Sequence, residues 1–507
     1  METAEDPYSS PSATGGNSET HQGASQKRKH SRLSEAPARE YGVMRDSGQH
    51  DTSRFVGSAS GIHFIRSVYQ RLSRNSTARG DAGRGVDHLV PGEDDQINLG
   101  QTPQNSESPR IWDATEVESD TVGDEQVPPF EQMIEWSQSY FELWHPTSPF
   151  LNAKEVLDLF DKISAGGVAS LSHLERSMVR SVFSISLADR RQSLPFSKPL
   201  PRSLVFHNIE EAISASHFTL YQPASLHATQ AALSIQLFLI SMLRLNAASR
   251  LGGLIVRMSF HLGLHRCPSR YPFFTPEEAS MRRRVFWSMY CNERFLSQSL
   301  GLPLDIKDDD VDVCYPGEEK HSDKPQSDDS RLKLLTYLSR HARVRGLILE
   351  LRNKAASSKD RIPFSESYVR AEMGRWTNEI QDALEDGDDD IQDNPDDDAA
   401  PRLSPGHRLY LSMLQFEAQI SLNRPMMAGG PSSDSWSAGL QYCISAARGI
   451  LSTLRKYQAQ QQTSGGDNFR LKCPIIWPTV TWAIWISSFI LIYAASERQV
   501  PVTSALR

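Results

Sequence analysis

Residues 261–313 read HLGLHRCPSRYPFFTPEEASMRRRVFWSMYCNERFLSQSLGLPLDIKDDDVDV. This stretch predicts a helix that begins after Thr275, because threonine is a good N-cap and Pro276 suits the first helical position. Glu278 stands three residues after the cap and completes a capping box. The stretch therefore contains a strong local signal for a helix start.

The body of this helix has an apolar face, to which Trp287 adds bulk. The face is formed by Val285, Phe286, Met289, Phe295 and Leu296. Gly301 and Pro303 are expected to stop the helix, since glycine favours the position after a helix and proline cannot continue it. The acidic residues 305–312 then lie outside it.

Apolar residues at helical spacing recur along much of the chain. Residues 225–243 are apolar on most sides, which predicts a helix buried inside a larger bundle. Pro146 is expected to end the first helix, because proline restricts the residue before it. No convincing set of strands and no fixed repeat is found, so the predicted fold is all-α, a large helical bundle. Further helices are predicted at residues 130–143, 153–163, 171–189, 246–264, 332–351, 409–420 and 438–454.

Composition divides the chain into four parts. The hydrophobic content of 38% and mean hydropathy of −0.46 are low for a fully globular chain. Residues 1–125 are predicted to be a largely disordered arm, in which the apolar run at 55–65 forms a turn that docks on the main domain. The main helical domain spans 126–384. An acidic linker or loop at 385–404, with an activation-type segment as the alternative, leads to C-terminal helices at 405–507 that pack on it.

Charge and cysteine usage argue against several classes of site. A net charge of −8 does not suit a body that grips nucleic acid. The cysteines are far apart and include no Cys-x-x-Cys pair, so neither a disulfide framework nor a thiolate zinc site is expected. This usage fits the reducing cytosol or nucleus, and the polar N-terminus shows no secretory signal. The five cysteines are Cys267, Cys291, Cys314, Cys443 and Cys473.

The segment 473–495 contains no charged residue and is long enough to span a membrane. Pro474 and Pro478 break its first third and leave a short apolar helix at 479–495. A buried core helix is therefore favoured over a tail anchor, and no membrane partner is expected.

Candidate chemical groups have structural explanations. His261 and His265 are four residues apart, but histidines near a helix C-terminus are favoured by the helix dipole without any metal. The arginines at 282–284 lie in an amphipathic helix, where ion pairs and packing are expected instead of DNA contacts. Arg283 and Arg284 are expected to form a charge network with Glu293. No catalytic, cofactor-binding or metal-ligating residue is predicted, so an enzyme is not expected.

Several of these segments together resemble the regulatory domain of fungal zinc-cluster (Zn2Cys6) transcription factors, of the type found in xylanolytic activators. The segments are LGLHR at 262–266, RRVFW at 283–287, GLP at 301–303 and the acidic run at 308–312. Residues 140–150 resemble the family's opening segment. The matching residues, to which the resemblance gives structural roles, are Gly263, His265, Arg266, Thr275, Glu278, Arg283, Arg284, Phe286, Trp287, Glu293, Arg294, Gly301, Pro303 and Asp309.

The chain departs from the family pattern in three places. Glu293 stands where the family has aspartate, and Leu302 stands where it has arginine. Family members bind two zinc ions through six cysteines, whereas no cysteine here precedes Cys267. The family's metal ligands therefore match no residue, and no cofactor is expected in this chain.

A short basic cluster near the N-terminus is a candidate nuclear import signal, with a solvated charge run as the alternative. It comprises Lys27, Arg28, Lys29 and Arg32. It also resembles the linker that often follows the zinc module, but a linker alone reads no base edges.

The resemblance implies a nuclear regulator of RNA polymerase II transcription that controls a metabolic or biosynthetic gene set. Promoter DNA would be bound through a zinc-cluster module, encoded by an exon missing from the gene model or carried by a partner. In the second case the chain is a co-regulator or inhibitor. Homodimers or heterodimers with zinc-cluster regulators and a small-molecule effector are also implied. The alternative from a different class is a helical scaffold or tail-anchored protein.

Overall fold

The computed structural model describes residues 42–45, 54–68, 110–113, 115–117, 127–191, 199–321, 330–353, 365–385, 403–429, 434–463 and 479–505. These residues lie within one compact unit, Arg39–Arg507. The basic cluster with Lys27, Arg28, Lys29 and Arg32 falls outside the described residues. So do Cys473 and nearly all of the acidic segment 385–404.

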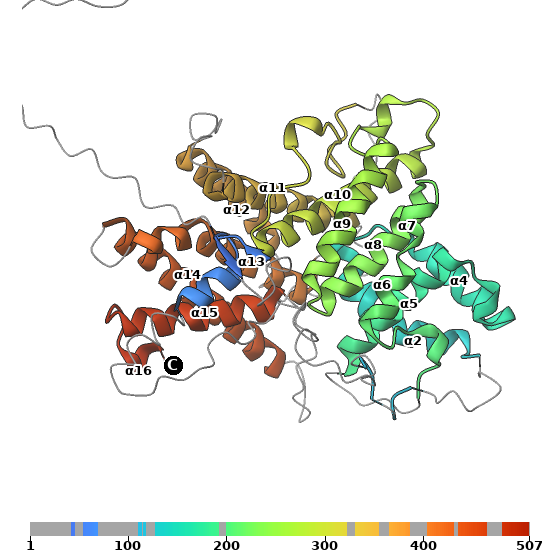
Figure 1. Ribbon diagram of the computed structural model, residues 1–507, viewed down its shortest axis with the longest axis horizontal. Helices are drawn as coiled ribbons and strands as arrows, with labels where there is room; N and C mark the ends of the chain where they lie inside the picture. Colours follow the sequence, from blue (N-terminus) through green and yellow to red (C-terminus); the bar gives the residue numbers. More distant parts are fainter. Residues whose placement is uncertain are drawn as a thin grey trace, which may run out of the picture. The chain divides into compact units, whose positions relative to one another are not determined.

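The described residues are predominantly helical, which confirms the predicted all-α fold (Figure 1). Two three-residue strands, β1 (Val43–Arg45) and β2 (Arg54–Val56), pair antiparallel, and residues 61–68 form a short helix. The α-helices are α2 (Phe130–Ser139), α3 (His145–Thr147), α4 (Ala153–Gly166), α5 (His173–Arg191), α6 (Ile209–Ala215), α7 (Phe218–Tyr221), α8 (Leu226–Ser241), α9 (Leu245–His261), α10 (Pro276–Leu300), α11 (Lys333–Asn353), α12 (Glu366–Glu385), α13 (Pro405–Asn423), α14 (Asp434–Thr463), α15 (Thr479–Ser496) and α16 (Val502–Ala505).

Three buried apolar clusters hold these helices together. The first joins α2, α4, α5, α8, α9 and α10. The second joins residues 61–68 to α13, α14 and α15, and the third joins α11, α12 and α13. Helix α8 packs against both α5 and α9, and every residue from Ala228 to Ser241 is buried. The prediction of a buried helix at 225–243 is therefore confirmed.

The prediction that Pro146 ends the first helix was wrong. A π-helical turn at Tyr140–Trp144 follows α2, and the chain then continues through α3 to Thr147. In this turn the amide of His145 donates to the carbonyl of Tyr140, five residues earlier. Because the hydrogen bonding changes register there, Pro146 falls at the start of a new helical segment, where its missing N–H is tolerated.

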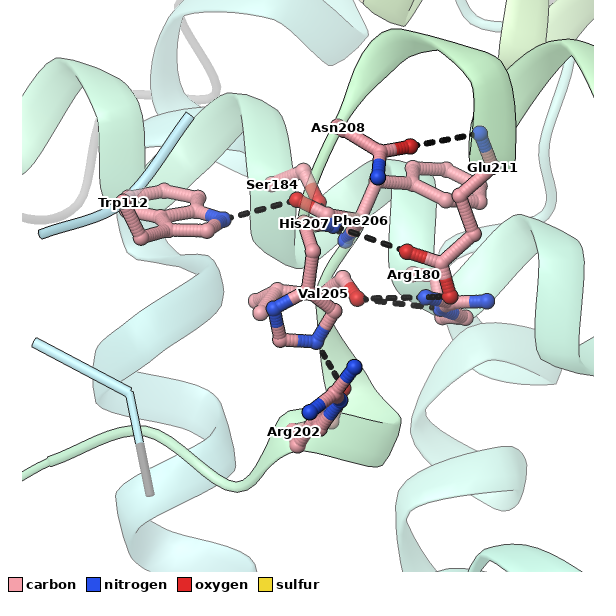
Figure 2. Close-up of polar contacts among 9 residues, drawn as sticks. All are labelled: Trp112, Arg180, Ser184, Arg202, Val205, Phe206, His207, Asn208 and Glu211. Carbon is pink, nitrogen blue, oxygen red and sulfur yellow. Dashed lines mark hydrogen bonds and ion pairs between the residues drawn. The ribbon is translucent and has the colours of Figure 1, made fainter. Parts of the chain in front are cut away.

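A polar network fixes the loop before α6 onto α5 (Figure 2). The guanidinium of Arg180 donates to the carbonyl of Val205 at 3.1 and 2.6 Å and forms an ion pair with Glu211. Trp112 Nε1 donates to the carbonyl of Phe206 at 2.8 Å. These bonds satisfy loop carbonyls that burial would otherwise leave unpaired.

The segment around residues 54–68 contacts both the end of α10 and the C-terminal helices. The amide of Gly57 lies 3.4 Å from the carbonyl of Leu300. A Cβ atom added at Gly57 would lie 1.9 Å from the carbonyl oxygen of Gly301, so this backbone approach requires glycine. Ile65 is fully buried in the cluster that contains α15.

Helix α15 is the one helix among the described residues that is long and apolar enough to cross a membrane by length and composition. Half of this helix is buried against the rest of the protein. Ile486 and Ile490 are 1% and 0% exposed and pack in the same cluster as Ile65. This burial is what a core helix shows, and a core helix passes the same length and composition test.

Candidate functional site

Helix α10 is built at both ends as its sequence predicts. Thr275 Oγ1 accepts from the amide of Glu278 at 3.2 Å, and Glu278 Oε2 accepts from the amide of Thr275 at 2.9 Å. Gly301 has a φ of +69°, the left-handed conformation that favours glycine after a helix. The capping box and the glycine stop are therefore confirmed.

The three consecutive arginines of α10 contact protein groups from other segments. Arg282 lies over the Phe274 ring at 4.2 Å. Arg283 is 2% exposed and pairs with Glu319 at 3.2 Å. Arg284 donates to the carbonyls of Pro149 and Leu151 at 2.7 Å each. Their predicted structural role is confirmed.

The predicted charge network of Arg283, Arg284 and Glu293 was wrong in its partners. Glu293 forms its ion pair with the adjacent Arg294. It also accepts from the amide of Asp305 at 2.8 Å. The three groups lie too far apart along α10 for one network, since residues more than one turn apart do not meet on a helix.

Arg294 is the centre of a buried ionic cluster and is 0% exposed. It donates to Asp308 at 2.7 Å and to the carbonyl of Ile306 at 2.9 Å, and it lies 4.3 Å from the Tyr290 ring. Burial alone would lower the pKa of Arg294, but Tyr290, Glu293 and Asp308 raise it overall. Burial raises the pKa of Glu293, against the effect of Arg294. The cluster fixes the acidic loop after α10 to the helix.

His265 lies beyond the end of α9, because this helix ends at His261 and Gly263 follows with a φ of +66°. The helix predicted to reach residue 264 is thus shorter, and the two histidines do not share a helix face. Burial and the nearby Arg266 lower the pKa of His265. Its carbonyl accepts from the amide of Asp312 at 3.2 Å, which joins the end of α9 to the acidic loop.

The remaining motif residues are distributed between the core and the loop. Phe286 and Trp287 are 0% and 4% exposed. Trp287 Nε1 donates to the carbonyl of Cys314 at 2.9 Å, and its ring stacks on Tyr315 with 4.5 Å between centroids. Asp309 lies in a 3-10 turn, Asp308–Asp310.

A cavity of about 70 Å³ lies next to this helix and is lined by residues of α3, α8, α10, α11, α13 and α15. This volume holds a few water molecules or a small ligand. The polar residues that line it include Ser148, Cys291, His341, Arg345 and Tyr410. The cavity therefore contacts helices from all three apolar clusters.

The cavity wall is mostly neutral near pH 7. Burial and the nearby Arg345 hold the pKa of His341 well below its ordinary value, and burial raises the pKa of Cys291 to about 12. Arg345 pairs with Glu417 at 2.7 Å. Ser148 Oγ and Arg345 Nε have no hydrogen-bond partner among the described residues. A small ligand with hydrogen-bond acceptors would satisfy both donors.

The sequence did not point to this cavity, although two signals were present. His341 and Arg345 are 2% and 6% exposed on α11, and a buried polar residue needs a partner. The spacing of four residues puts them on one face. Cys291 lies on α10, and only the packing of α10 against α11 and the other lining helices brings it to the same cavity.

Comparison with known proteins adds a family match. Residues 137–370 match the family described as fungal specific transcription factor domain. A probable transcription factor of Fusarium proliferatum, FUP6, is 24% identical over 88% of this chain and 70% of its own length. The transcriptional activator acu-15 of Neurospora crassa is 24% identical over 57% of this chain, which spans only 30% of that relative.

A third relative matches only a short segment. An uncharacterized transcriptional regulatory protein of Schizosaccharomyces pombe, C530.08, is 46% identical over 11% of the chain and 6% of its own length. The chain thus spans less than a third of the length of two of these three relatives. No solved structure matches the chain.

Proposed function

We propose that this fungal transcription regulator uses its helical body as a ligand-responsive regulatory domain acting in the nucleus, since residues 137–370 match the fungal specific transcription factor domain. The observation that carries this proposal is the cavity, whose two unpaired buried donors, Ser148 Oγ and Arg345 Nε, belong to the matched residues 137–370. The genes that it controls would be transcribed by RNA polymerase II and would form a metabolic or biosynthetic gene set.

The proposed effector is a small molecule with hydrogen-bond acceptors and an apolar body. Ser148 and Arg345 would donate to it, while Leu237, Ile240 and Leu338 line the apolar wall. Binding would alter how α8, α10 and α11 pack, because the cavity lies between them. Such a ligand shifts the domain only as far as it binds one packing arrangement more tightly than the other.

Promoter DNA would be contacted through a zinc-cluster module, in a longer form of the protein or in a dimer partner. The residues of this chain do not fit the six-cysteine cluster of the family. The chain has five cysteines, and the described residues bring together one possible ligand group, which has two cysteines and one histidine. No DNA-reading role is therefore assigned to any residue here.

A reporter assay tests the proposal. The full chain, fused to an unrelated DNA-binding module, is expected to change reporter output, and the change is expected to depend on growth conditions that supply the effector. Ser148→Ala should abolish that dependence while leaving the fold intact, because it removes an unpaired hydroxyl. Ser487→Ala is the matched control, since this buried serine bonds to Ala483 away from the cavity.

Two outcomes would reject the proposal. Reporter output that ignores the fused chain would argue against a regulator. Reporter output that still depends on growth conditions in Ser148→Ala would argue against the cavity as the effector site. Fractionation of tagged protein into membranes instead of nuclei would favour the alternative of a tail-anchored scaffold, and genome-wide mapping of chromatin binding would identify the target genes.

A further inference from the structure

Three potential metal ligands from separate segments meet beside α10. Cys267 follows the end of α9, Cys314 follows the acidic loop, and His321 lies seven residues further on. Cys267 Sγ lies 3.7 Å from Cys314 Sγ, and Cys314 Sγ lies 3.1 Å from His321 Nδ1. All three ligand atoms lie within 4.8 Å of one another.

The two cysteines are held in place by hydrogen bonds from surrounding groups. The amide of Cys267 donates to Asp312 Oδ1 at 2.8 Å. The carbonyl of Cys314 accepts from Trp287 Nε1, and its sulfur accepts from the amide of Lys320 at 3.3 Å. An amide donor on the sulfur stabilises a thiolate, the form that binds metals. Cys267 is 0% and Cys314 is 7% exposed, while His321 is half-buried.

These distances agree with a tetrahedral metal site. With Zn–S bonds of about 2.3 Å and tetrahedral angles, two sulfur ligands lie about 3.8 Å apart, close to the 3.7 Å between these sulfurs. The same geometry places sulfur and nitrogen ligands about 3.6 Å apart, compared with 3.1 Å between Cys314 Sγ and His321 Nδ1.

We propose that Cys267, Cys314 and His321 bind one Zn²⁺ ion, with a water molecule or an exogenous ligand in the fourth position. Two thiolates balance the charge of the ion, so the occupied site is neutral, as its burial requires. Thiolate and imidazole ligands favour zinc over hard cations such as magnesium. The expectation that widely spaced cysteines exclude a zinc site considered only spacing along the sequence, whereas the fold brings the ligands together.

Arg270 opposes metal binding at this site. Its guanidinium lies 2.8 Å from His321 Nε2 and pairs with Asp312 at 2.9 Å. A histidine that binds metal through Nδ1 carries its proton on Nε2 and then needs an acceptor there. Arg270 cannot accept, so this half-exposed side chain has to move away when the ion binds. Replacing it by glutamine, whose carbonyl oxygen can accept, should strengthen binding.

Metal binding by the full, reduced chain tests the proposal. Zn²⁺ is titrated against a chromophoric chelator, and Co²⁺ is added as a spectroscopic probe of thiolate ligands. We expect one ion per chain with thiolate-to-cobalt absorption bands. Cys314→Ala should weaken binding by more than about 100-fold and His321→Ala by about 10- to 100-fold, whereas Arg270→Gln should tighten it by up to about 10-fold. Metal binding releases the protons of the two thiols, so occupancy should fall as the pH is lowered.

Cys443→Ala is the matched control, because Cys443 is also buried but belongs to the cluster around α14 and α15. Circular dichroism verifies that each variant remains folded. Zinc binding that is unchanged in Cys314→Ala, or absent from the folded wild-type chain, would overturn the proposal. A Cys267–Cys314 disulfide in air-oxidised protein, combined with no zinc uptake after reduction, would overturn it in favour of a redox pair.

Discussion

Helices α10 and α15 are both core helices, but their side chains are buried for different physical reasons. Helix α15 has no charged residue, and the side chains of Ile486 and Ile490 bury without polar partners. Helix α10 carries charges along its length and still buries Arg283, Glu293 and Arg294. Burial of α15 follows from its composition, whereas burial of α10 depends on partners supplied by other segments.

This difference has a consequence for how specifically each helix is placed. A buried charge is costly unless a partner meets it at the correct position, so Arg294 holds one particular loop, the one that carries Asp308. Apolar contacts are less directional and tolerate repacking. Both the cavity and the proposed zinc site lie against helix α10.

Breaking the ionic cluster of α10 should have the largest effect. Arg294→Met is expected to lower the free energy of unfolding by about 3–5 kcal/mol, because it leaves Glu293 buried without its cation. Urea denaturation measures this loss. The double variant Glu293→Gln with Arg294→Met should recover part of it, since both charges are then gone. A loss below about 1 kcal/mol in the single variant would show that the cluster is not buried as described.

Removing the largest ring of α10 should cost nearly as much. Trp287→Ala is expected to destabilise the protein by about 3–5 kcal/mol through lost burial and the cavity that remains. Trp287→Phe keeps a ring against Tyr315 but loses the bond to Cys314, so about 1–2 kcal/mol is expected. Thermal melts of the three proteins check this order. A near-neutral shift for the alanine variant would show that the helix is not core.

Helix α15 provides the apolar side of the comparison. Ile490→Ala should cost about 2–5 kcal/mol, because its side chain is fully buried. Ile492→Ala, on the same helix and 44% exposed, should be close to neutral. Denaturant unfolding of the full chain measures the loss of stability in both variants. Equal, small effects at both positions would contradict a core helix and favour a membrane anchor.

The buried Asp189 on α5 differs from Glu293 because its partners are neutral. It accepts from Trp144 and Ser139 at 2.6 and 3.0 Å, and burial raises its pKa to about 6. The folded state then binds a proton more tightly than the unfolded chain. Stability contributed by protonation is present below pH 4 and is lost as the pH rises to about 6, by about 1–3 kcal/mol. Asp189→Asn should remove this slope in unfolding measured from pH 4 to pH 7.

The cap of α10 should have the smallest effect. Thr275→Ala removes the side-chain acceptor for the amide of Glu278 and should cost about 1 kcal/mol. Thr275→Ser keeps the oxygen and should stay near wild type. The comparison uses melting temperatures of the two variants. Equal values would mean that the cap contributes nothing to the stability of the whole domain.

Local signals in the sequence were reliable where the interactions join residues within one or two helical turns. Thr275 with Glu278 gave the start of α10, and Gly301 gave its end, because caps involve neighbouring residues only. The prediction that Pro146 ends the first helix was wrong because a π-helical turn, which no local pattern indicated, changes the hydrogen bonding before it. The partners of Arg283 and Arg284 were missed for another reason: Glu319, Pro149 and Leu151 are distant in sequence.

By itself, the sequence determined the helical class, the caps of α10, the apolar character of α8 and α15, and the family resemblance of the motif. Each of these depends on residue type and on spacing within a few turns. Only the tertiary structure decided that Cys267 meets Cys314 and His321, that Arg294 reaches Asp308, and that Cys291, His341 and Arg345 share a cavity. These contacts join separate segments, and their positions are set by how whole helices pack.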